Sequence, residues 1–491
     1  MINQAPFLVV GIPLFSALLM GSLAPFFPSL VTLIGIAGVS LGGITSVVLF
    51  QQVRQFGKIT YEFGNWPAPI GIEYSVDHLN ALMILLIYVV AFFSYIYSLK
   101  SVPLEIPNHK HGYYYTLYFL LITGLVGITI TGDAFNLYVL FEICALSSYA
   151  LLASGGRRAT LATFYYLLIG TIGACFYLIG VAYLFIKTGT LNMAHLFELI
   201  PPIYFTSSIL VAFLFINIGL FIKMALFPLH GWLPNVYTKA PISTTCLLAP
   251  LGTKLSIYIL LRFYFDVFNP EYVFHVLNIQ SLMVWLATIA IIVGSIYAIF
   301  HTRFRHILAF IVVAEIGYII GGIWTGHPDS ILGSIYHICA DSLMTLSLFM
   351  IAGTILFYLK SETLSDCAHM FRRLPVTSIA LVIVFASIVG IPPTSGFFSK
   401  LYLIKGAFQM GQYQFIVALL FSSLAGVFIF FRLFETYFYN SSPSDTSTPT
   451  IKEDRLFTLP LIGVSASILL LGLTFSFWHQ FILNIIPVGL R

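Results

Sequence analysis

The feature that most constrains this chain is a series of long apolar segments that carry almost no charge. Of its 491 residues, 59% are hydrophobic and 8% are charged, whereas a soluble domain carries about 25% charged residues. So few charges cannot cover a water-facing surface, and about 20 apolar residues suffice to cross a bilayer as a helix. The chain is therefore expected to be an all-α integral membrane protein with lipid covering most of its outside.

Fourteen segments have the length and apolar character of a transmembrane helix. They are expected at residues 6–26, 28–49, 76–99, 113–131, 134–153, 159–186, 205–232, 240–262, 278–300, 305–325, 331–359, 374–401, 412–432 and 456–480. The longest polar stretches between them are 50–75, 100–112, 360–373 and 433–455, and the last is expected to be a solvated, flexible loop. Because no polar stretch separates two cores, residues 1–491 are expected to form one transmembrane domain, whose first span, from Pro6, is retained.

The distribution of lysine and arginine predicts how these segments are oriented. With the N-terminus outside, six basic residues fall in outer loops or helix ends: Arg54, Lys58, Lys187, Arg262, Lys405 and Arg491. Thirteen fall inside: Lys100, Lys110, Arg157, Arg158, Lys239, Arg303, Arg305, Lys360, Arg372, Arg373, Arg432, Lys452 and Arg455. Cytoplasmic loops are enriched in Lys and Arg, so the bias favours an even number of spans in the inner (plasma) membrane, with both termini outside.

Ionisable residues also occur within the apolar segments. They are three acids, three lysines and one histidine: Glu142, Glu315, Asp341, Lys223, Lys254, Lys400 and His337. A charge at the bilayer centre costs about 2.5–3.5 kcal/mol on insertion scales, so these side chains are expected to face one another or water inside the bundle. Such rows mark proton and ion pathways, and they are the candidate site here. The alternative is a structural role, in which the charges only neutralise one another between helices.

Two of the lysines lie beside expected breaks in their helices. Pro228 cannot donate the helical bond to the carbonyl of Met224, so the seventh span should kink or unwind just after Lys223. In the twelfth span, two glycines and two prolines between Gly390 and Gly396 come shortly before Lys400. Broken helices at membrane depth are tolerated where they line a polar cavity. His230, near the first break, either belongs to this cavity or lies at the membrane interface.

The spacing of these features predicts an internal repeat. The two lysines beside breaks are five spans apart, and so are Glu142 and Glu315. Because five is odd, the two halves run in opposite directions, which is typical of an inverted repeat. We expect three N-terminal helices in 1–110, a first repeat in 111–264, a second repeat in 278–432, and a loop and last helix in 433–491.

Two further spans carry polar residues at helical spacing. Lys254 follows Pro250 near the middle of the eighth span. In the eleventh span, Ser334, His337, Asp341 and Thr345 form one polar stripe, on which His337 and Asp341 are expected to touch. The alternative is a seam between packed helices.

Several function classes find no support in the sequence. It contains no phosphate-binding loop, nucleotide fingerprint or zinc-ligand pattern. The five cysteines lack metal-ligand spacing and are expected to be free thiols. No cofactor, metal or nucleic-acid partner is therefore expected.

The motifs resemble the proton-pumping membrane subunits shared by NADH-quinone oxidoreductase and the Mrp-type cation/proton antiporters, over roughly residues 70–435. The resemblance is carried by the run 137–153 around Glu142, the segment 223–234, Ala240-Pro241-Ile242-Ser243 leading to Lys254, the run 306–310 before Gly317-Tyr318, and the run 392–400. It implies fourteen helices, inverted repeats and a polar axis at the bilayer midplane. It also implies that Glu142 and Lys223 form an acid–lysine pair, that Lys254 is a bridging base, and that Lys400 is the terminal charge.

The chain departs from this family pattern mainly in its second half. Glu315 and Asp341 stand where the family often has histidine, Thr345 stands where a central lysine is usual, and Asn235 replaces a common aspartate. Lys400 and the absence of a lateral C-terminal helix favour a protein like the D-type subunit of an Mrp-type Na⁺(K⁺)/H⁺ antiporter, bound to other membrane subunits. The alternatives are a proton-pumping subunit of NADH-quinone oxidoreductase or of a related redox or inorganic-carbon uptake complex, and a structural subunit that no longer pumps.

Overall fold

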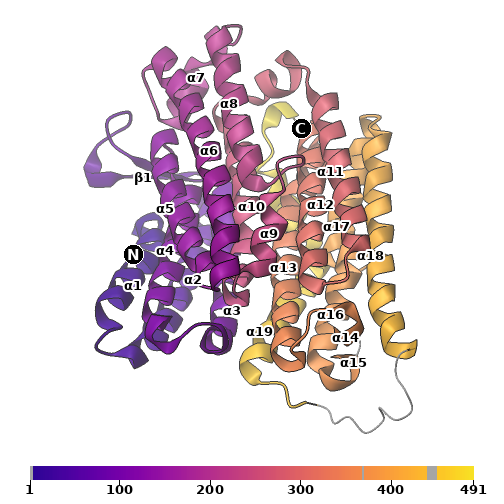
Figure 1. The fold of residues 1–491 in the computed structure, drawn as a ribbon. Helices are drawn as coiled ribbons and strands as arrows, with labels where there is room; N and C mark the ends of the chain where they lie inside the picture. Colours follow the sequence, from indigo (N-terminus) through magenta and orange to yellow (C-terminus); the bar gives the residue numbers. More distant parts are fainter. Residues whose placement is uncertain (1–3, 368–369, 440–450, 491) are drawn as a thin grey trace.

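The computed structural model describes residues 4–367, 370–439 and 451–490, and it is a bundle of long, roughly parallel helices (Figure 1). The first part contains α1 (Ala5–Leu23), α2 (Pro28–Phe56), α3 (His78–Glu105), α4 (His111–Ile130), α5 (Ala134–Ala153), α6 (Arg157–Thr188), α7 (Met193–Leu199), α8 (Ser207–Met224), α9 (Trp232–Lys239) and α10 (Ile242–Asp266). The second part contains α11 (Gln280–Phe300), α12 (Phe304–Trp324), α13 (Pro328–Leu359), α14 (Leu364–Cys367), α15 (Met370–Arg373), α16 (Pro375–Val389), α17 (Ser395–Gln409), α18 (Tyr413–Tyr439), α19 (Arg455–Leu473) and α20 (Phe475–Leu483).

The expected membrane fold is confirmed. Thirteen helices in the described part of the chain are long and apolar enough to cross a membrane: α1–α6, α8, α10–α13, α18 and α19. The expected twelfth span is divided between α16 and α17, and the expected seventh span between α8 and α9. Both breaks fall where proline and glycine were expected to place them.

Some expected boundaries were wrong. The second span continues to Phe56 and ends at Gly57, whose φ of 78° is a left-handed conformation that glycine adopts freely. The polar stretch 50–75 also contains an antiparallel hairpin of β1 (Ile59–Glu62) and β2 (Glu73–Val76), with Ile59 opposite Val76. Alternate residues of β1 are exposed, the period-2 pattern of a half-buried strand.

The last part of the chain also differs from expectation. The thirteenth span extends to Tyr439, so helix occupies the start of the stretch 433–455 that was expected to be a solvated, flexible loop. Residues 440–450 of that stretch lie outside the described residues. The final span is divided at Thr474 between α19 and α20.

Carboxylates from distant parts of the chain satisfy the N-termini of two membrane helices. Glu105 accepts the backbone N–H groups of Ile242 (2.7 Å) and Ser243 (3.2 Å) at the start of α10. Glu453 accepts the N–H group of Val376 (2.8 Å) at the start of α16. The first N–H groups of a helix lack intrahelical partners and attract negative charge. These caps therefore fix where α10 and α16 begin.

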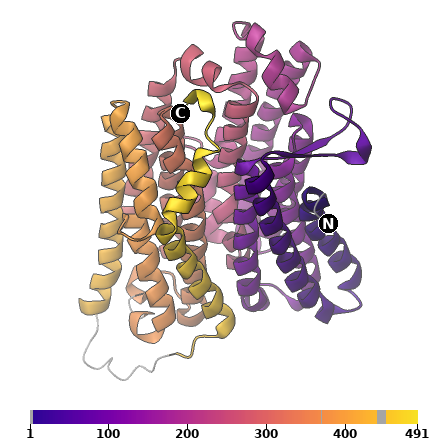
Figure 2. The same cartoon turned by 180° about the vertical axis from the view of Figure 1, so that it is seen from behind.

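The most enclosed helices lie where the two halves of the chain meet. α10, α12 and α13 are buried on almost every side, whereas α2, α6 and α18 keep wide exposed apolar faces. α10 packs against α13, which also contacts α12 and α17. Viewed from behind, α19 and α20 run beside the N-terminal helices (Figure 2). Charged groups on α10, α12 and α13 therefore lie deep inside the bundle, away from lipid.

The fold predicts which loops share a side of the membrane. Between the β1–β2 hairpin and the loop 360–374 the chain crosses nine times, counting α8–α9 as one crossing. An odd number places them on opposite sides, which we call the hairpin side and the far side. Thr60→Cys and Ser365→Cys, both at exposed positions, should react with an impermeant thiol reagent from opposite sides of sealed vesicles. Labelling of both from one side would refute this topology.

Candidate functional site

The seven ionisable residues singled out in the sequence come from six elements. They are Glu142 on α5, Lys223 at the end of α8, Lys254 on α10, Glu315 on α12, His337 and Asp341 on α13, and Lys400 on α17. All are buried except Glu142, which is partly exposed. They form three groups in the structure: Glu142 near Lys223, a central group, and Lys400 beside the second helix break.

Lys223 lies on the last turn of α8, as expected. The helix stops at Met224 because Ala225 takes a left-handed conformation, with φ of 60°. The carbonyl of Ile222 accepts the indole N–H of Trp232 at 3.0 Å. The break thus leaves a lysine at a helix C-terminus, where the helix dipole favours a positive charge.

Glu142 and Lys223 are neighbours without a direct ion pair among the described residues. The Lys223 Nζ lies 4.4 Å from the centre of the Phe141 ring, in a cation–π contact. The Oε1 atom of Glu142 is buried and accepts no hydrogen bond from any described residue. A buried carboxylate oxygen without a protein partner is usually bound by water. The arrangement leaves room for a switch in which Glu142 and Lys223 communicate through water rather than by contact.

Lys254 and Asp341 form the central ion pair. The Lys254 Nζ lies 2.7 Å from Asp341 Oδ2, and their side chains are 0% and 3% exposed. Asp341 Oδ1 accepts the Thr345 hydroxyl at 2.9 Å. The pair joins α10 in the first half to α13 in the second.

The expected contact between His337 and Asp341 is not made. The Nε2 atom of His337 lies 2.5 Å from Glu315 Oε2, and its Nδ1 atom lies 2.9 Å from the Ser399 hydroxyl. Both ring nitrogens therefore have partners on α12 and α17. The histidine points from α13 toward Glu315, while Asp341, one turn later, points toward Lys254.

Lys400 fills the second helix break. Its Nζ donates to the carbonyl of Ile388, near the end of α16, and to the hydroxyl of Ser423 at 2.8 Å. It also lies 5.2 Å from the centre of the Tyr318 ring, which stacks against His337 at 5.3 Å. Lysine and histidine therefore contact one tyrosine ring. His230, by contrast, lies beside Phe227 and has no contact with this group in the described structure.

Chemically, the central group is a set of closely spaced proton donors and acceptors in a dry environment. The acid–imidazole pair of Glu315 and His337 can share one proton, and Asp341 and Lys254 can share another. One helical turn separates the two pairs on α13, a distance that a single water molecule can bridge. The group suits stepwise proton transfer.

Comparison with known proteins identifies the family of this chain. The sequence profile of the NADH:quinone oxidoreductase/Mrp antiporter transmembrane family matches residues 131–426, more than half of the chain. The chain belongs to this family. It is 36% identical to the N-type subunit of NADH-quinone oxidoreductase from Desulforudis audaxviator, over 100% of this chain and 99% of the relative.

Other members of the family are similarly close. The D-type subunit of the Na⁺/H⁺ antiporter from Bacillus subtilis is 30% identical, with 98% of this chain and 95% of the relative covered. A chain in the structure of the membrane-bound sulfane sulfur reductase, an archaeal respiratory membrane complex, superposes with a TM-score of 0.89 at 28% identity, covering 98% of this chain and 97% of that one.

Three polar residues in this member of the family were not singled out as site residues. Tyr318 and Ser399 contact His337, and Ser423 contacts Lys400. The sequence offered a signal for two of them: Tyr318 follows Glu315 by about one helical turn, and Ser399 directly precedes Lys400. Ser423 had none, because its role depends on how α18 packs beside α17.

The central ion pair generates a stability prediction. Lys254→Met or Asp341→Leu leaves the partner buried without its counter-charge, which typically costs about 3–5 kcal/mol. The double variant replaces both charges with apolar groups and should recover most of that loss. Thermal unfolding in detergent would measure this. The pair of exposed Lys405 and partly exposed Asp329, 3.2 Å apart, is the control, and Lys405→Met should cost less than about 1 kcal/mol. Additive losses in the double variant would contradict the pairing.

Proposed function

We propose that the chain is an ion-translocating subunit of a multisubunit membrane complex, and that protons cross it along Glu142, Lys223, Lys254, Asp341, His337, Glu315 and Lys400. The observation that carries the proposal is the buried central group, in which Lys254–Asp341 and Glu315–His337 lie in direct contact. Intramembrane ionisable groups are costly and are usually kept for transport. A purely structural role would not need a histidine with a hydrogen-bond partner on each ring nitrogen.

The first proposed setting is an Mrp-type Na⁺(K⁺)/H⁺ antiporter, with this chain in the position of the D-type subunit. It is supported by the similarity to the Bacillus subtilis antiporter protein over nearly the whole chain. The second is a redox-driven complex, supported by the higher identity to an N-type subunit of NADH-quinone oxidoreductase over the full length of both chains. Vesicles that contain the assembled complex separate the two. An antiporter acidifies or alkalinises the lumen when Na⁺ or K⁺ is added, whereas a redox complex requires an electron donor and acceptor.

The orientation is proposed from charge. The thirteen inner basic residues fall on the far side, and five of the six outer ones fall on the hairpin side or at helix ends that reach it. The sixth, Arg491, lies outside the described residues. Because positive charge is retained in the cytoplasm, we place the hairpin side and both termini outside the plasma membrane. The halves 111–264 and 278–432 are proposed as the two inverted repeats, which meet where α10 packs against α13.

The first half is proposed to work as a proton switch. A proton on Glu142 removes its attraction for the Lys223 ammonium group, which favours release of a proton from that lysine. Glu142→Ala and Lys223→Ala should therefore each abolish ion-coupled proton movement in vesicles, while the complex still assembles. The matched controls Glu435→Ala and Lys187→Ala, at exposed positions, should leave it near the wild-type rate. Full activity in either of the first two variants would defeat the switch.

The second half is proposed to relay protons, despite its exchange of bases for acids. Asp341→Asn keeps the size of the side chain and an acceptor for Thr345, but it removes the proton-binding group beside Lys254. Proton movement should fall by about tenfold or more, as for Lys223→Ala, with unchanged amounts of protein in the membrane. If the second half only balances charge, Asp341→Asn should transport at nearly the wild-type rate.

A further inference from the structure

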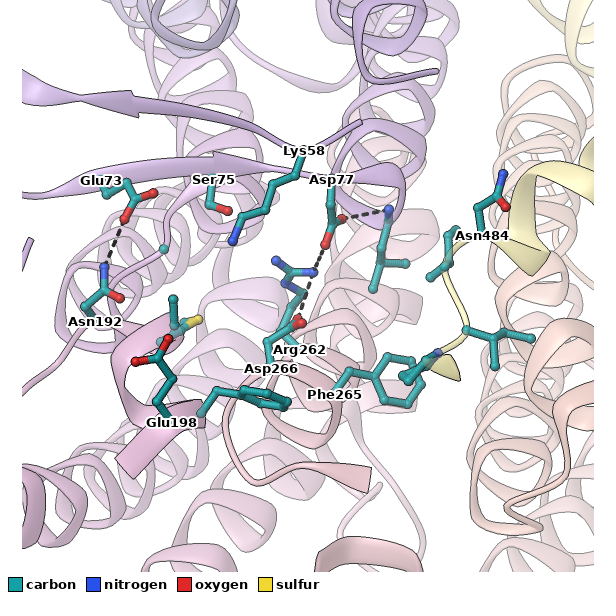
Figure 3. A pocket seen from close by; sticks show the side chains of 18 of the residues that line it. Lys58, Glu73, Ser75, Asp77, Asn192, Glu198, Arg262, Phe265, Asp266 and Asn484 are labelled. Carbon is teal, nitrogen blue, oxygen red and sulfur yellow. Dashed lines mark hydrogen bonds and ion pairs between the residues drawn. The ribbon is translucent and has the colours of Figure 1, made fainter. Parts of the chain in front are cut away.

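A polar pocket opens on the hairpin side, away from the central group. It has a volume of about 470 Å³ and is bounded by the β1–β2 hairpin, α7, the end of α10 and the segment after α20. Charged side chains line it from several elements: Lys58, Glu73, Asp77, Glu198, Arg262 and Asp266. Figure 3 shows these side chains around the pocket. They come from the residue before β1 (Lys58), β2 (Glu73), the start of α3 (Asp77), α7 (Glu198) and α10 (Arg262 and Asp266). None of them belongs to the row of residues described above.

Arg262 lies across the floor of this pocket. It is only 8% exposed, and its guanidinium lies 2.5 Å from Asp77 and 2.9 Å from Asp266 (Figure 3). Ser75, also buried, lines the pocket and has no side-chain hydrogen bond to any described residue.

The same helix joins this floor to the central ion pair. Lys254, Tyr258 and Arg262 follow one another at intervals of four residues and therefore lie on one face of α10. Thr253, beside Lys254, is fully buried, and its hydroxyl has no partner among the described residues. Polar atoms without a described partner therefore occur next to Lys254, at Thr253 on α10, and in the pocket, at Ser75 on β2.

Tyr258 is held in the middle of the face by hydrogen bonds to two other helices, α3 and α4. Its hydroxyl donates to the carbonyl of Thr129 at 2.7 Å and accepts from the amide of Asn80 at 2.9 Å. The other end of the Asn80 side chain accepts the backbone N–H of Asp77 at 3.0 Å. Asp77 in turn holds Arg262. One continuous set of polar contacts thus connects Tyr258 to the charged floor of the pocket.

We infer that this pocket is the mouth of a proton outlet, which leads from Lys254 past Tyr258 to the hairpin side and is closed by Arg262. The inference rests on the proposed proton route. In the step, the Lys254 ammonium transfers a proton to a water hydrogen-bonded to the Tyr258 hydroxyl, leaving a neutral amine and a hydronium ion. The excess proton then passes through water to the pocket.

Arg262 is suited to closing this outlet. Its guanidinium stays protonated under all ordinary conditions, so it cannot carry the proton itself, and its positive charge repels a hydronium ion. Asp77 and Asp266 hold it in place from two sides. When it swings into the pocket, the carboxylate-rich walls remain to attract the departing proton. Arg262, Asp77 and Asp266 are thus positioning residues, whereas Tyr258 contacts the transferred proton.

The closing experiment measures access to the outlet in the assembled complex, in sealed vesicles with the native cysteines replaced. A Tyr258→Cys variant is treated from the hairpin side with cationic and with anionic methanethiosulfonates. With Arg262 intact, labelling should be slow. Adding Arg262→Gln should speed both reagents by about tenfold or more. The control is Tyr177→Cys, a buried site whose tyrosine also donates to a backbone carbonyl, at 2.9 Å, and its rate should not change.

Three other labelling results would overturn the inference that Arg262 closes this outlet. Acceleration of the cationic reagent alone would mean only that a charge was removed, and acceleration at Tyr177→Cys as well would mean that the bundle had loosened. Unchanged slow labelling in the Arg262→Gln background would mean that no path exists. Arg262→Lys, which keeps the charge but has a shorter side chain to reach Asp77 and Asp266, should fall between wild type and Arg262→Gln.

Transport is measured in parallel and separates this inference from the proposed function. Tyr258→Phe should slow proton movement by about tenfold, while Tyr177→Phe should not. Normal transport in Tyr258→Phe would overturn the outlet even if Lys223→Ala still abolishes transport. If the wild type moves no protons, the proposed function fails, and the labelling rates still decide whether a gated path links Tyr258 to the pocket.

Discussion

The cost of placing ionised groups in a bilayer determines how this bundle is built. A charged side chain needs a partner, water or a polar backbone group at membrane depth. The structure answers this demand differently for each lysine. Lys254 has a carboxylate, Lys400 has a freed carbonyl and a hydroxyl, and Lys223 has an aromatic face and a helix C-terminus. The three solutions require α10 to face α13 and require both helix breaks.

The two helix breaks therefore provide groups that stabilise two of the buried lysines, Lys223 and Lys400. An unbroken helix satisfies all its carbonyls internally and offers none to an ammonium group. Ending α16 at Val389 frees the carbonyl of Ile388 for Lys400, and ending α8 at Met224 places Lys223 at the negative end of a helix dipole. The carboxylates Glu105 and Glu453 cap the far-side ends of α10 and α16. They fix the start of α10, which follows α9, and the start of α16, which leads into the second break.

The sequence predicted the features that depend on local chemistry. The length of the apolar segments predicted the spans, and the prolines near Lys223 and Lys400 predicted the helix breaks. Which side chain on another helix each ionisable residue contacts could not be predicted in the same way, because those contacts depend on how the helices are rotated about their axes. His337 and Asp341 share one helix face, yet the histidine turns to Glu315 on α12 and the aspartate to Lys254 on α10. The β1–β2 hairpin was missed because its two short strands pair across a loop of ten residues, Phe63–Ile72.

The two halves differ in how protons can move through them. Around Glu142 and Lys223 no direct ion pair between described residues holds the charges, and the Lys223 ammonium group lies over the Phe141 ring instead. In the second half, contacts are continuous from Glu315 through His337 to Ser399. The Lys254–Asp341 pair stands between these regions. Two unit charges 4 Å apart interact by about 4 kcal/mol at an effective dielectric constant of 20.

That interaction exceeds the roughly 1–3 kcal/mol by which separate sites are typically coupled. Protonation of Asp341 therefore frees Lys254 from its counter-charge, and arrival of a proton at Lys254 strengthens the hold on an ionised Asp341. Because such coupling is reciprocal, in the proposed route a charge that enters either half would alter the proton affinity of the other. The buried pair between α10 and α13 would then link the two proposed halves without a large movement of the helices.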